Sequence, residues 1–168
     1  MTDLLYLTDA DDVTTFEATV KETTPEYIVL DGTYFYPEGG GQPADHGKLS
    51  WDGGEATVTN VRKSHGDVRH EIEDVSGRLP EPGTTVEGEI DTRRRQKLTR
   101  MHTAQHVVSR VVLDEYGATT AGNQIYPDRS RIDFEPAEFD DADVELIERR
   151  SNEVIDRDLS VRKENRDR

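Results

Sequence analysis

The hydrophobic pattern of this chain changes its period once, near Asp91, and this change constrains the fold more than any other feature. Before Asp91, short segments alternate apolar with polar residues or are rich in Val, Ile, Thr, Tyr and Phe. After it, apolar residues recur at every third or fourth position. Alternation is typical of strands, and the longer period is typical of helices. We therefore predict an α+β protein, with a β domain over residues 1–90 and a domain of helices and strands over residues 91–168.

Six strands are predicted in the first domain, because turn signals divide it at intervals of about 8–12 residues. The turns are Asp31-Gly32, Asp52-Gly53-Gly54, His65-Gly66-Asp67 and Pro80-Glu81-Pro82-Gly83. The predicted strands are residues 14–22, 26–32, 46–51, 55–63, 67–73 and 84–91. This spacing is typical of a small barrel or a sandwich, and the pattern alone leaves both open.

The second domain is predicted to contain two helices. The first begins at Asp91 or Thr92 and ends before Gly117, with an apolar face formed by Leu98, Met101, Val108, Val111, Val112 and Tyr116. A strand over residues 129–136, with Ile132 and Phe134 on one side, precedes a second helix over residues 139–159. The residues of that helix expected to face inward are Val144, Ile147, Val154 and Ile155. A further strand is expected to begin over residues 159–164.

These elements make a thin sheet that buries too little of the two helices. We therefore expect that the chain is shortened or that a partner supplies the remainder of the sheet.

Composition restricts the setting in which the protein works. The chain has 36 acidic and 21 basic residues and a net charge of −15, and its lysines are Lys21, Lys48, Lys63, Lys97 and Lys163. We predict a halophilic, cytoplasmic protein, since high salt screens self-repulsion; an ordinary acidic cytosolic protein is the alternative. Cysteine is absent, which excludes disulfides and thiolate ligands within these residues. Neither a signal peptide nor an apolar run of about 18 residues is found, so no membrane association is expected.

His102 and His106 form the first candidate site, in the stretch MHTAQH. Two histidines four residues apart project from one helix face, and a tetrahedral metal accepts this spacing. Thr103 stands where the helix of a zinc protease has glutamate, so that class is excluded. Zinc takes three or four protein ligands, and His46 is one alternative for a third. Two hydrogen-bonded histidines without metal are the other interpretation, and Thr103 and Gln105 are candidates for supporting the site.

The stretch FYPEGGGQPADHG is the second candidate. The three consecutive glycines Gly39–Gly41 allow close approach to the main chain, and Gln42 and Asp45 add polar groups. A wide hairpin turn is the structural alternative. The stretch is not a Walker A loop, because no Lys-Ser/Thr follows the glycines.

Together, TYFYPEGGGQPADHG and RRRQKLTRMHTAQHVVSRVV resemble the AlaX family of alanyl-tRNA editing proteins and the editing region of alanyl-tRNA synthetase. The stretch YGATTAGNQIYPDRSRIDFEP and the helix through Asn152 and Glu153 fit as well, so the resemblance covers essentially the whole chain. It implies a glycine-rich β-barrel domain followed by an α+β editing domain.

The resemblance also implies an activity, namely hydrolysis of the ester in tRNA-Ala wrongly charged with serine or glycine. His102 and His106 would be two zinc ligands. Gly39, Gly40, Gly41 and Gln42 would lie near the substrate end of the tRNA. Thr119, Thr120 and Gln124, in the loop after the histidine helix, are candidates for an amino-acid pocket, with ordinary loop polar residues as the alternative.

The sequence departs from the family in one respect. The family's remaining zinc ligands come from a Cys-x-x-x-His motif beyond the position that matches Arg168. We therefore expect a shortened form that holds zinc weakly, which leaves open whether the chain itself is a deacylase. The alternatives are a non-catalytic remnant that binds tRNA or a partner, and one half of a split protein whose second polypeptide supplies the Cys-x-x-x-His segment.

A basic segment surrounds the start of the histidine helix. Residues 91–110 contain six basic residues and one acidic residue, although the net charge of the whole chain opposes phosphate binding. The candidate RNA-binding residues are Arg93, Arg94, Arg95, Lys97 and Arg100. Contacts with the phosphates of a tRNA acceptor stem are one interpretation, and a solvated helix start is the other.

Overall fold

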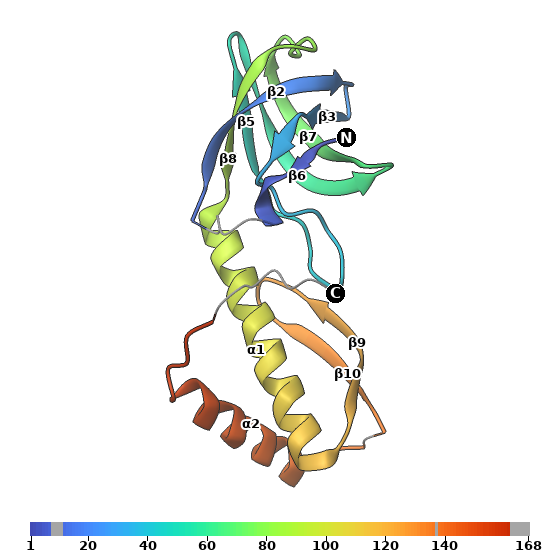
Figure 1. Cartoon of the computed structure of the whole chain (residues 1–168), viewed down its shortest axis with the longest axis vertical. Helices are drawn as coiled ribbons and strands as arrows, with labels where there is room; N and C mark the ends of the chain where they lie inside the picture. Colours follow the sequence, from blue (N-terminus) through green and yellow to red (C-terminus); the bar gives the residue numbers. More distant parts are fainter. Residues whose placement is uncertain (8–11, 137, 162–168) are drawn as a thin grey trace. The chain divides into compact units, whose positions relative to one another are not determined.

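The computed structural model describes residues 1–7, 12–136 and 138–161, which form two compact units. The first unit is Met1–Leu98, and the second begins at Thr99. The division falls within helix α1 (Thr92–Tyr116), so the first turns of this helix belong to the first unit. Figure 1 labels the strands and helices of both units.

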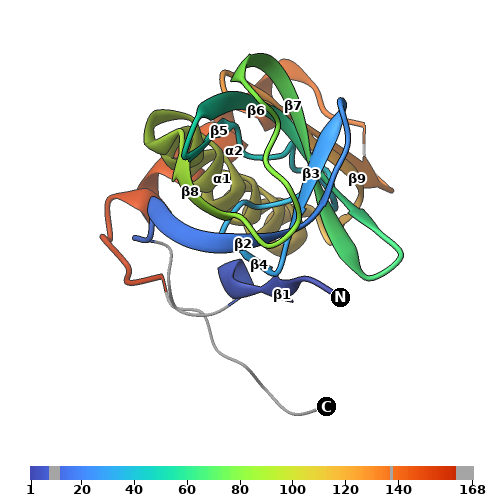
Figure 2. The ribbon, with the colours of Figure 1, turned by 90° about the horizontal axis from the view of Figure 1, so that it is seen from above.

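Six strands of the first unit form a closed antiparallel barrel in the order β2-β3-β7-β6-β5-β8 (Figure 2). They are β2 (Thr15–Thr23), β3 (Tyr27–Leu30), β5 (Gly47–Trp51), β6 (Gly54–Ser64), β7 (Asp67–Gly77) and β8 (Thr85–Ile90). All six predicted strands are confirmed, and of the two architectures that the pattern left open the barrel is the one formed. The short strands β1 (Asp3–Leu4) and β4 (Gly32–Thr33) pair in parallel, and the 3-10 helix η1 (Leu5–Leu7) follows β1.

Alternation along the strands fills the barrel with apolar side chains. In β8 every second residue is buried, from Val86 to Ile90. Phe35, Ile28 and Leu49 are fully buried in the same cluster. Because closure pairs every barrel strand on both sides, the ring has no free edge.

His70 is a polar side chain within this core and is fully buried. Its Nδ1 lies 3.0 Å from the carbonyl oxygen of Ile28, and its Nε2 lies 2.8 Å from Thr33 Oγ1. Since a carbonyl can only accept, the hydrogen-bond network assigns the proton to Nδ1 and makes the Thr33 hydroxyl the donor to Nε2. Burial lowers the pKa of His70 to about 4, so the ring is neutral near pH 7.

Helix α1 has the predicted boundaries. Asp91 Oδ1 accepts a hydrogen bond of 3.0 Å from the backbone N–H of Arg94, which caps the start. At the other end Gly117 has φ +67°, and its N–H donates to the carbonyl of Leu113 at 3.0 Å.

In the second unit, β9 (Thr119–Ile125) and β10 (Ser130–Glu135) form a two-stranded antiparallel sheet. The predicted strand over residues 129–136 is confirmed as β10. The placement of Thr119, Thr120 and Gln124 in a loop is wrong, because all three lie in β9. The first residues of β9 are exposed and carry no apolar alternation, so its backbone pairing with β10 leaves no pattern in the sequence.

Helix α2 (Asp141–Ile155) begins with a capping box between Asp140 and Asp143. The predicted helix is confirmed, but part of its inward face is wrong. Val144 and Ile155 are 54% and 56% exposed, whereas Ser151 is buried.

The inward face of α2 is instead the series Asp143, Ile147, Ser151 and Val154, which are all at least half-buried. The Tyr116 hydroxyl donates to Asp143 Oδ1 at 2.9 Å, and this polar contact fixes a face that apolar spacing alone does not identify.

The strand predicted over residues 159–164 is not found in the described part, because Leu159–Val161 has no regular structure. Residues 162–164 lie outside the described residues. Within the described ranges, no helix is both long enough and apolar enough to cross a membrane.

Candidate active site

His102 and His106 lie on one face of α1 with their rings stacked. The ring centroids are 4.8 Å apart, and the ring planes differ by 29°. Both residues are exposed. A spacing of four residues on an unbroken helix therefore brings the two imidazoles together at the surface, as the first half of a metal site requires.

The donor set fits zinc only in part. Among residues 1–7, 12–136 and 138–161, no group of three or more His, Cys, Asp or Glu side chains is arranged to hold a metal ion. The pair on α1 thus offers two of the three or four ligands that a zinc site takes. Gln105, a candidate for supporting the pair, is 8% exposed and accepts a hydrogen bond of 3.2 Å from Asn123 Nδ2.

A hollow of about 300 Å³ lies between α1 and β10 in the second unit. Its lining residues are Met101, Ala104, Gln105, Val108, Ser130, Ile132 and Phe134. The Ser130 hydroxyl is buried and has no hydrogen-bond partner among the described residues. The hollow is therefore mostly apolar, with polar atoms from Gln105 and Ser130.

The three polar residues predicted for an amino-acid pocket do not line this hollow. Thr119 Oγ1 donates to the carbonyl of Glu135 at 3.3 Å, and Thr120 Oγ1 donates to Ser109 Oγ at 2.9 Å. Gln124 Nε2 donates to the carbonyl of Ile125 at 3.3 Å.

Of the residues that line the hollow, Gln105 was predicted as a candidate for supporting the histidine pair, and the others were not predicted as site residues. A sequence signal for them exists, because Gln105 interrupts the apolar series of α1 and Ser130 stands two residues before Ile132. Pairing β10 with a specific face of α1, however, requires the three-dimensional structure.

The glycine-rich stretch is a hairpin whose tip is Gly39–Gln42, referred to below as the glycine hairpin. Gly39 and Gln42 exchange two backbone hydrogen bonds of 3.0 Å. Gly40 and Gly41 have φ values of +59° and +81°, which glycine adopts without strain. A Cβ built on Gly39 or Gly40 would meet no heavy atom within 4 Å. At Gly40 the turn conformation, and not crowding, therefore accounts for the glycine.

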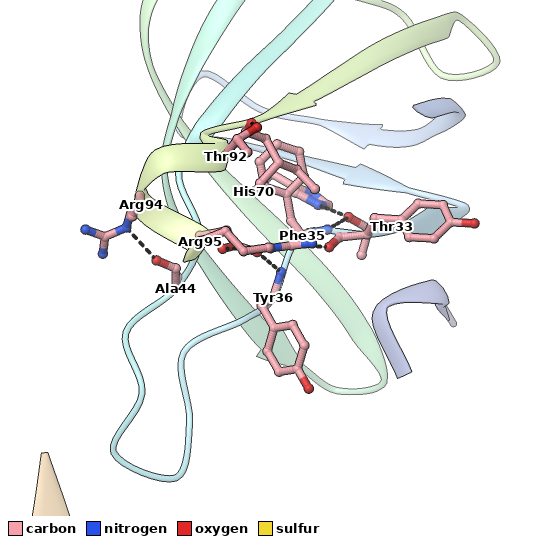
Figure 3. Close-up of polar contacts among 11 residues, drawn as sticks. Thr33, Phe35, Tyr36, Ala44, His70, Thr92, Arg94 and Arg95 are labelled. Carbon is pink, nitrogen blue, oxygen red and sulfur yellow. Dashed lines mark hydrogen bonds and ion pairs between the residues drawn. The ribbon is translucent and has the colours of Figure 1, made fainter. Parts of the chain in front are cut away.

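The predicted RNA-binding residues divide into two groups. Arg94 Nε donates to the carbonyl of Ala44 at 3.0 Å (Figure 3), and Arg95 forms an ion pair with Asp45. Both are partly buried, and their guanidinium groups contact the barrel unit. The exposed group is Arg93, Lys97 and Arg100. Their spacing of four and three residues places them in one stripe along the start of α1.

Burial also affects two ionisable groups beside this stripe. It lowers the pKa of Arg94, against the opposing effect of the Asp45 and Asp91 carboxylates. Burial, and then the charge of Arg94, lower the pKa of His46, the residue considered as a third metal ligand. His46 is half-buried in the first unit.

Comparisons with known proteins show which chains are similar to this one. The family model for class II (A) tRNA synthetases matches residues 6–94. The chain is 46% identical over 160 residues to the alanyl-tRNA editing protein AlaX-M of Methanosarcina barkeri, covering 92% of this chain and 65% of that protein. It is 37% identical over 164 residues to AlaX-M of Saccharolobus solfataricus, covering 96% of this chain and 67% of that protein.

A third relative is the alanine–tRNA ligase of Methanopyrus kandleri, which is 44% identical over 146 residues, or 84% of this chain and 16% of that protein. The chain spans about 65% of the length of the Methanosarcina relatives that it matches.

The match over residues 6–94 places the chain in the domain family of the class II (A) tRNA synthetases. Within that class, the chain belongs to the family of AlaX-M alanyl-tRNA editing proteins, and the predicted resemblance is confirmed.

Proposed function

We propose that this chain acts in the editing of tRNA-Ala, by hydrolysing the ester that links a wrongly attached serine or glycine to the tRNA. The observation that carries the proposal is the exposed, stacked pair His102 and His106 in a chain that matches AlaX-M proteins over more than nine-tenths of its length.

In this proposal His102 and His106 hold zinc. A bound zinc ion can polarise an ester carbonyl or lower the pKa of a bound water. The contribution of the two imidazoles is to offer their nitrogen lone pairs at the surface of α1, where a large substrate has access. Because imidazole must be neutral to bind a metal, acidification weakens the site.

The glycine hairpin is proposed to receive the substrate end of the tRNA. Its tip carries glycines at exposed positions Gly39 and Gly40, so a substrate can approach the main chain there without meeting a side chain. The hollow beside α1 is proposed to receive the small side chain of the substrate, because it is mostly apolar and carries polar atoms from Gln105 and Ser130.

Arg93, Lys97 and Arg100 are proposed to contact tRNA phosphates. The net charge of −15 opposes RNA binding, so the exposed basic stripe must act locally. Arg93→Ala is expected to reduce the slope of log affinity against log salt by about 0.7–0.9, the loss of one phosphate contact. Arg62→Ala, on the barrel beside Glu38 and Glu71, is the control and should leave the slope unchanged. Equal slopes for Arg93→Ala and the unaltered chain would contradict the assignment.

The test of the activity is hydrolysis of Ser-tRNA-Ala and Gly-tRNA-Ala by the 168-residue chain in multimolar salt. His102→Ala should reduce the rate by about a hundredfold or more, as expected when a metal ligand is lost. His65→Asn is the matched control, because His65 is exposed in a barrel turn with φ +51°, a conformation that asparagine tolerates. Equal rates for His102→Ala and His65→Asn would contradict the proposal.

A second candidate is a non-catalytic or split form, favoured by the lack of a third metal-binding side chain beside the pair in the described residues. A second polypeptide with a Cys-x-x-x-His segment would then complete the ligand set. Zinc affinity measured with and without a peptide of that pattern separates the two candidates. A gain of about a hundredfold or more on adding the peptide supports the split form, and an unchanged affinity argues against it.

A further inference from the structure

The ion pair between Asp45 and Arg95 differs from the other ion pairs of the described residues. Its side chains are 2% and 12% exposed, whereas in every other pair both side chains are at least 33% exposed. Burying two charges carries a desolvation penalty that a well-packed apolar pair avoids. The pair therefore calls for an explanation beyond general stability.

Its contacts connect both arms of the glycine hairpin to the first turns of α1. Asp45 Oδ2 accepts from Arg95 Nη2 and, at 2.7 Å, from the backbone N–H of Tyr36. Asp45 Oδ1 accepts from Arg95 Nε at 3.3 Å. The same Arg95 Nη2 also donates to the carbonyl of Tyr34 at 2.7 Å.

Two further bonds complete the base of the hairpin. The backbone N–H of Asp45 donates to the carbonyl of Tyr36 at 3.0 Å, which closes the two arms on each other. Arg94 Nε donates to the carbonyl of Ala44 on the returning arm (Figure 3). The base is thus held at Tyr34, Tyr36, Ala44 and Asp45, all within the first unit.

The tip contrasts with this base. Within the tip, Gly39 and Gln42 exchange two backbone hydrogen bonds, and beside it the backbone N–H of Glu38 donates to the carbonyl of Val61 on β6 at 2.9 Å. Gly39 and Gly40 fill no packed site, because a Cβ built on either would meet no heavy atom within 4 Å. The direction of the tip is set at Glu38 and at the base of the hairpin, and the planar Arg–carboxylate pair supplies the directional constraint at the base.

We propose that Asp45 and Arg95 are positioning residues of the editing reaction, which hold the glycine hairpin in the orientation that its substrate contacts require. This inference rests on the proposed function, in which the tip receives the ester end of the tRNA.

Two single variants test it. Asp45→Asn keeps an oxygen for the Tyr36 N–H but removes the charge, and Arg95→Lys keeps the charge but removes the planar fork. The control is Glu55→Gln, which breaks the exposed Lys48–Glu55 pair of the same unit. Asp45→Asn combined with Arg95→Met leaves no unpaired buried charge and serves if a single variant fails to fold.

The first readout is amide hydrogen exchange, which does not depend on catalysis. Exchange at Gly39 and Gln42 should rise by about tenfold or more in Asp45→Asn, while amides of the barrel core such as Val58 keep their protection. Arg95→Lys should lie between Asp45→Asn and the unaltered chain. Unchanged exchange at the tip in a folded variant would overturn the proposal.

The second readout separates positioning from binding. In Asp45→Asn, kcat for Ser-tRNA-Ala should fall by about tenfold or more, because misplacing a contact at the reacting group costs rate. The tRNA dissociation constant should stay within about twofold, because phosphate contacts dominate affinity. A parallel loss of tRNA binding, or an unchanged kcat, would overturn the positioning role. Absence of hydrolysis by the unaltered chain would overturn the proposed function, while the exchange result would still report whether the pair fixes the hairpin.

Discussion

The two units of this protein differ in how fully they bury their apolar side chains and pair their strands. In the first unit six strands close on themselves, so every barrel strand is paired on both sides and the core residues Phe35, Leu49 and Val58 are fully buried. In the described part of the second unit, the sheet has two strands, and Val144 and Ile155 of α2 are more than half exposed. A closed ring stabilises itself through many residues distant in sequence, whereas two helices on a hairpin depend on few.

The histidines of the two units differ in burial in the same way. The buried histidine, His70, belongs to the barrel and is fixed by two hydrogen bonds, which suits a structural role. The exposed histidines His102 and His106 belong to the second unit and stand at its surface, which suits a site that meets a ligand.

The largest expected effect is in the barrel core. Leu49→Ala should lower the free energy of unfolding of the first unit by about 2–5 kcal/mol, because a cavity replaces a fully buried side chain. Denaturant unfolding followed by the fluorescence of Trp51, the single tryptophan, reports on this unit. Val144→Ala is the matched change in the second unit, and helical circular dichroism should show a difference within about 0.5 kcal/mol. Similar losses at both positions would contradict the comparison.

Acidification should have the second-largest effect, and it should lower the stability of the barrel. His70 titrates near 6.5 when unfolded and at about 4 in the folded unit, so the unfolded chain binds the additional proton between these values. The free energy of unfolding therefore falls by about 3 kcal/mol as the pH drops from about 6.5 to about 4. Above about pH 6.5, His70 causes no further change of this free energy with pH. The Trp51 transition measured at several pH values checks this.

Replacing His70 is the control for the acid effect. In His70→Gln the pH dependence of the Trp51 transition over that range should become shallower, whatever the effect on stability at neutral pH. A dependence as steep as that of the unaltered chain would assign the acid sensitivity to other groups.

The smallest effect concerns the capping box of α2. Asp140→Ala should destabilise the second unit by about 1 kcal/mol, because the backbone N–H of Asp143 loses its acceptor at 2.9 Å. Asp140→Asn, which keeps an oxygen, should lose less. Helical circular dichroism during thermal unfolding measures both, and a shift in the Trp51 transition instead would show that the two units do not unfold separately.

The same contrast explains what could be predicted from the sequence. The barrel strands and α1 follow from local signals, since alternation, Gly-containing turns and the capping residue Asp91 all lie within the segments they define. Strand β9 could not be predicted, because Thr119 and Thr120 enter a sheet through backbone pairing with β10. The inward face of α2 was misjudged for the same reason, as Asp143 faces inward through its bond with Tyr116.

Some features of the candidate site could likewise be predicted from the sequence, and others could not. The spacing of His102 and His106 predicted that they project from one face of a helix, and in the structure their rings stack on that face. The hollow beside α1 and the attachment of Arg94 and Arg95 to the barrel depend on residues distant in sequence, and no local pattern encodes such contacts.

The most direct measurement of the central claim is single-turnover hydrolysis of Ser-tRNA-Ala by the unaltered chain in multimolar salt, before chelation, after chelation and after zinc is returned. We expect hydrolysis that chelation removes and zinc restores, and no restoration in His102→Ala. Hydrolysis that survives chelation, or a folded chain that shows none even with excess zinc, would contradict it.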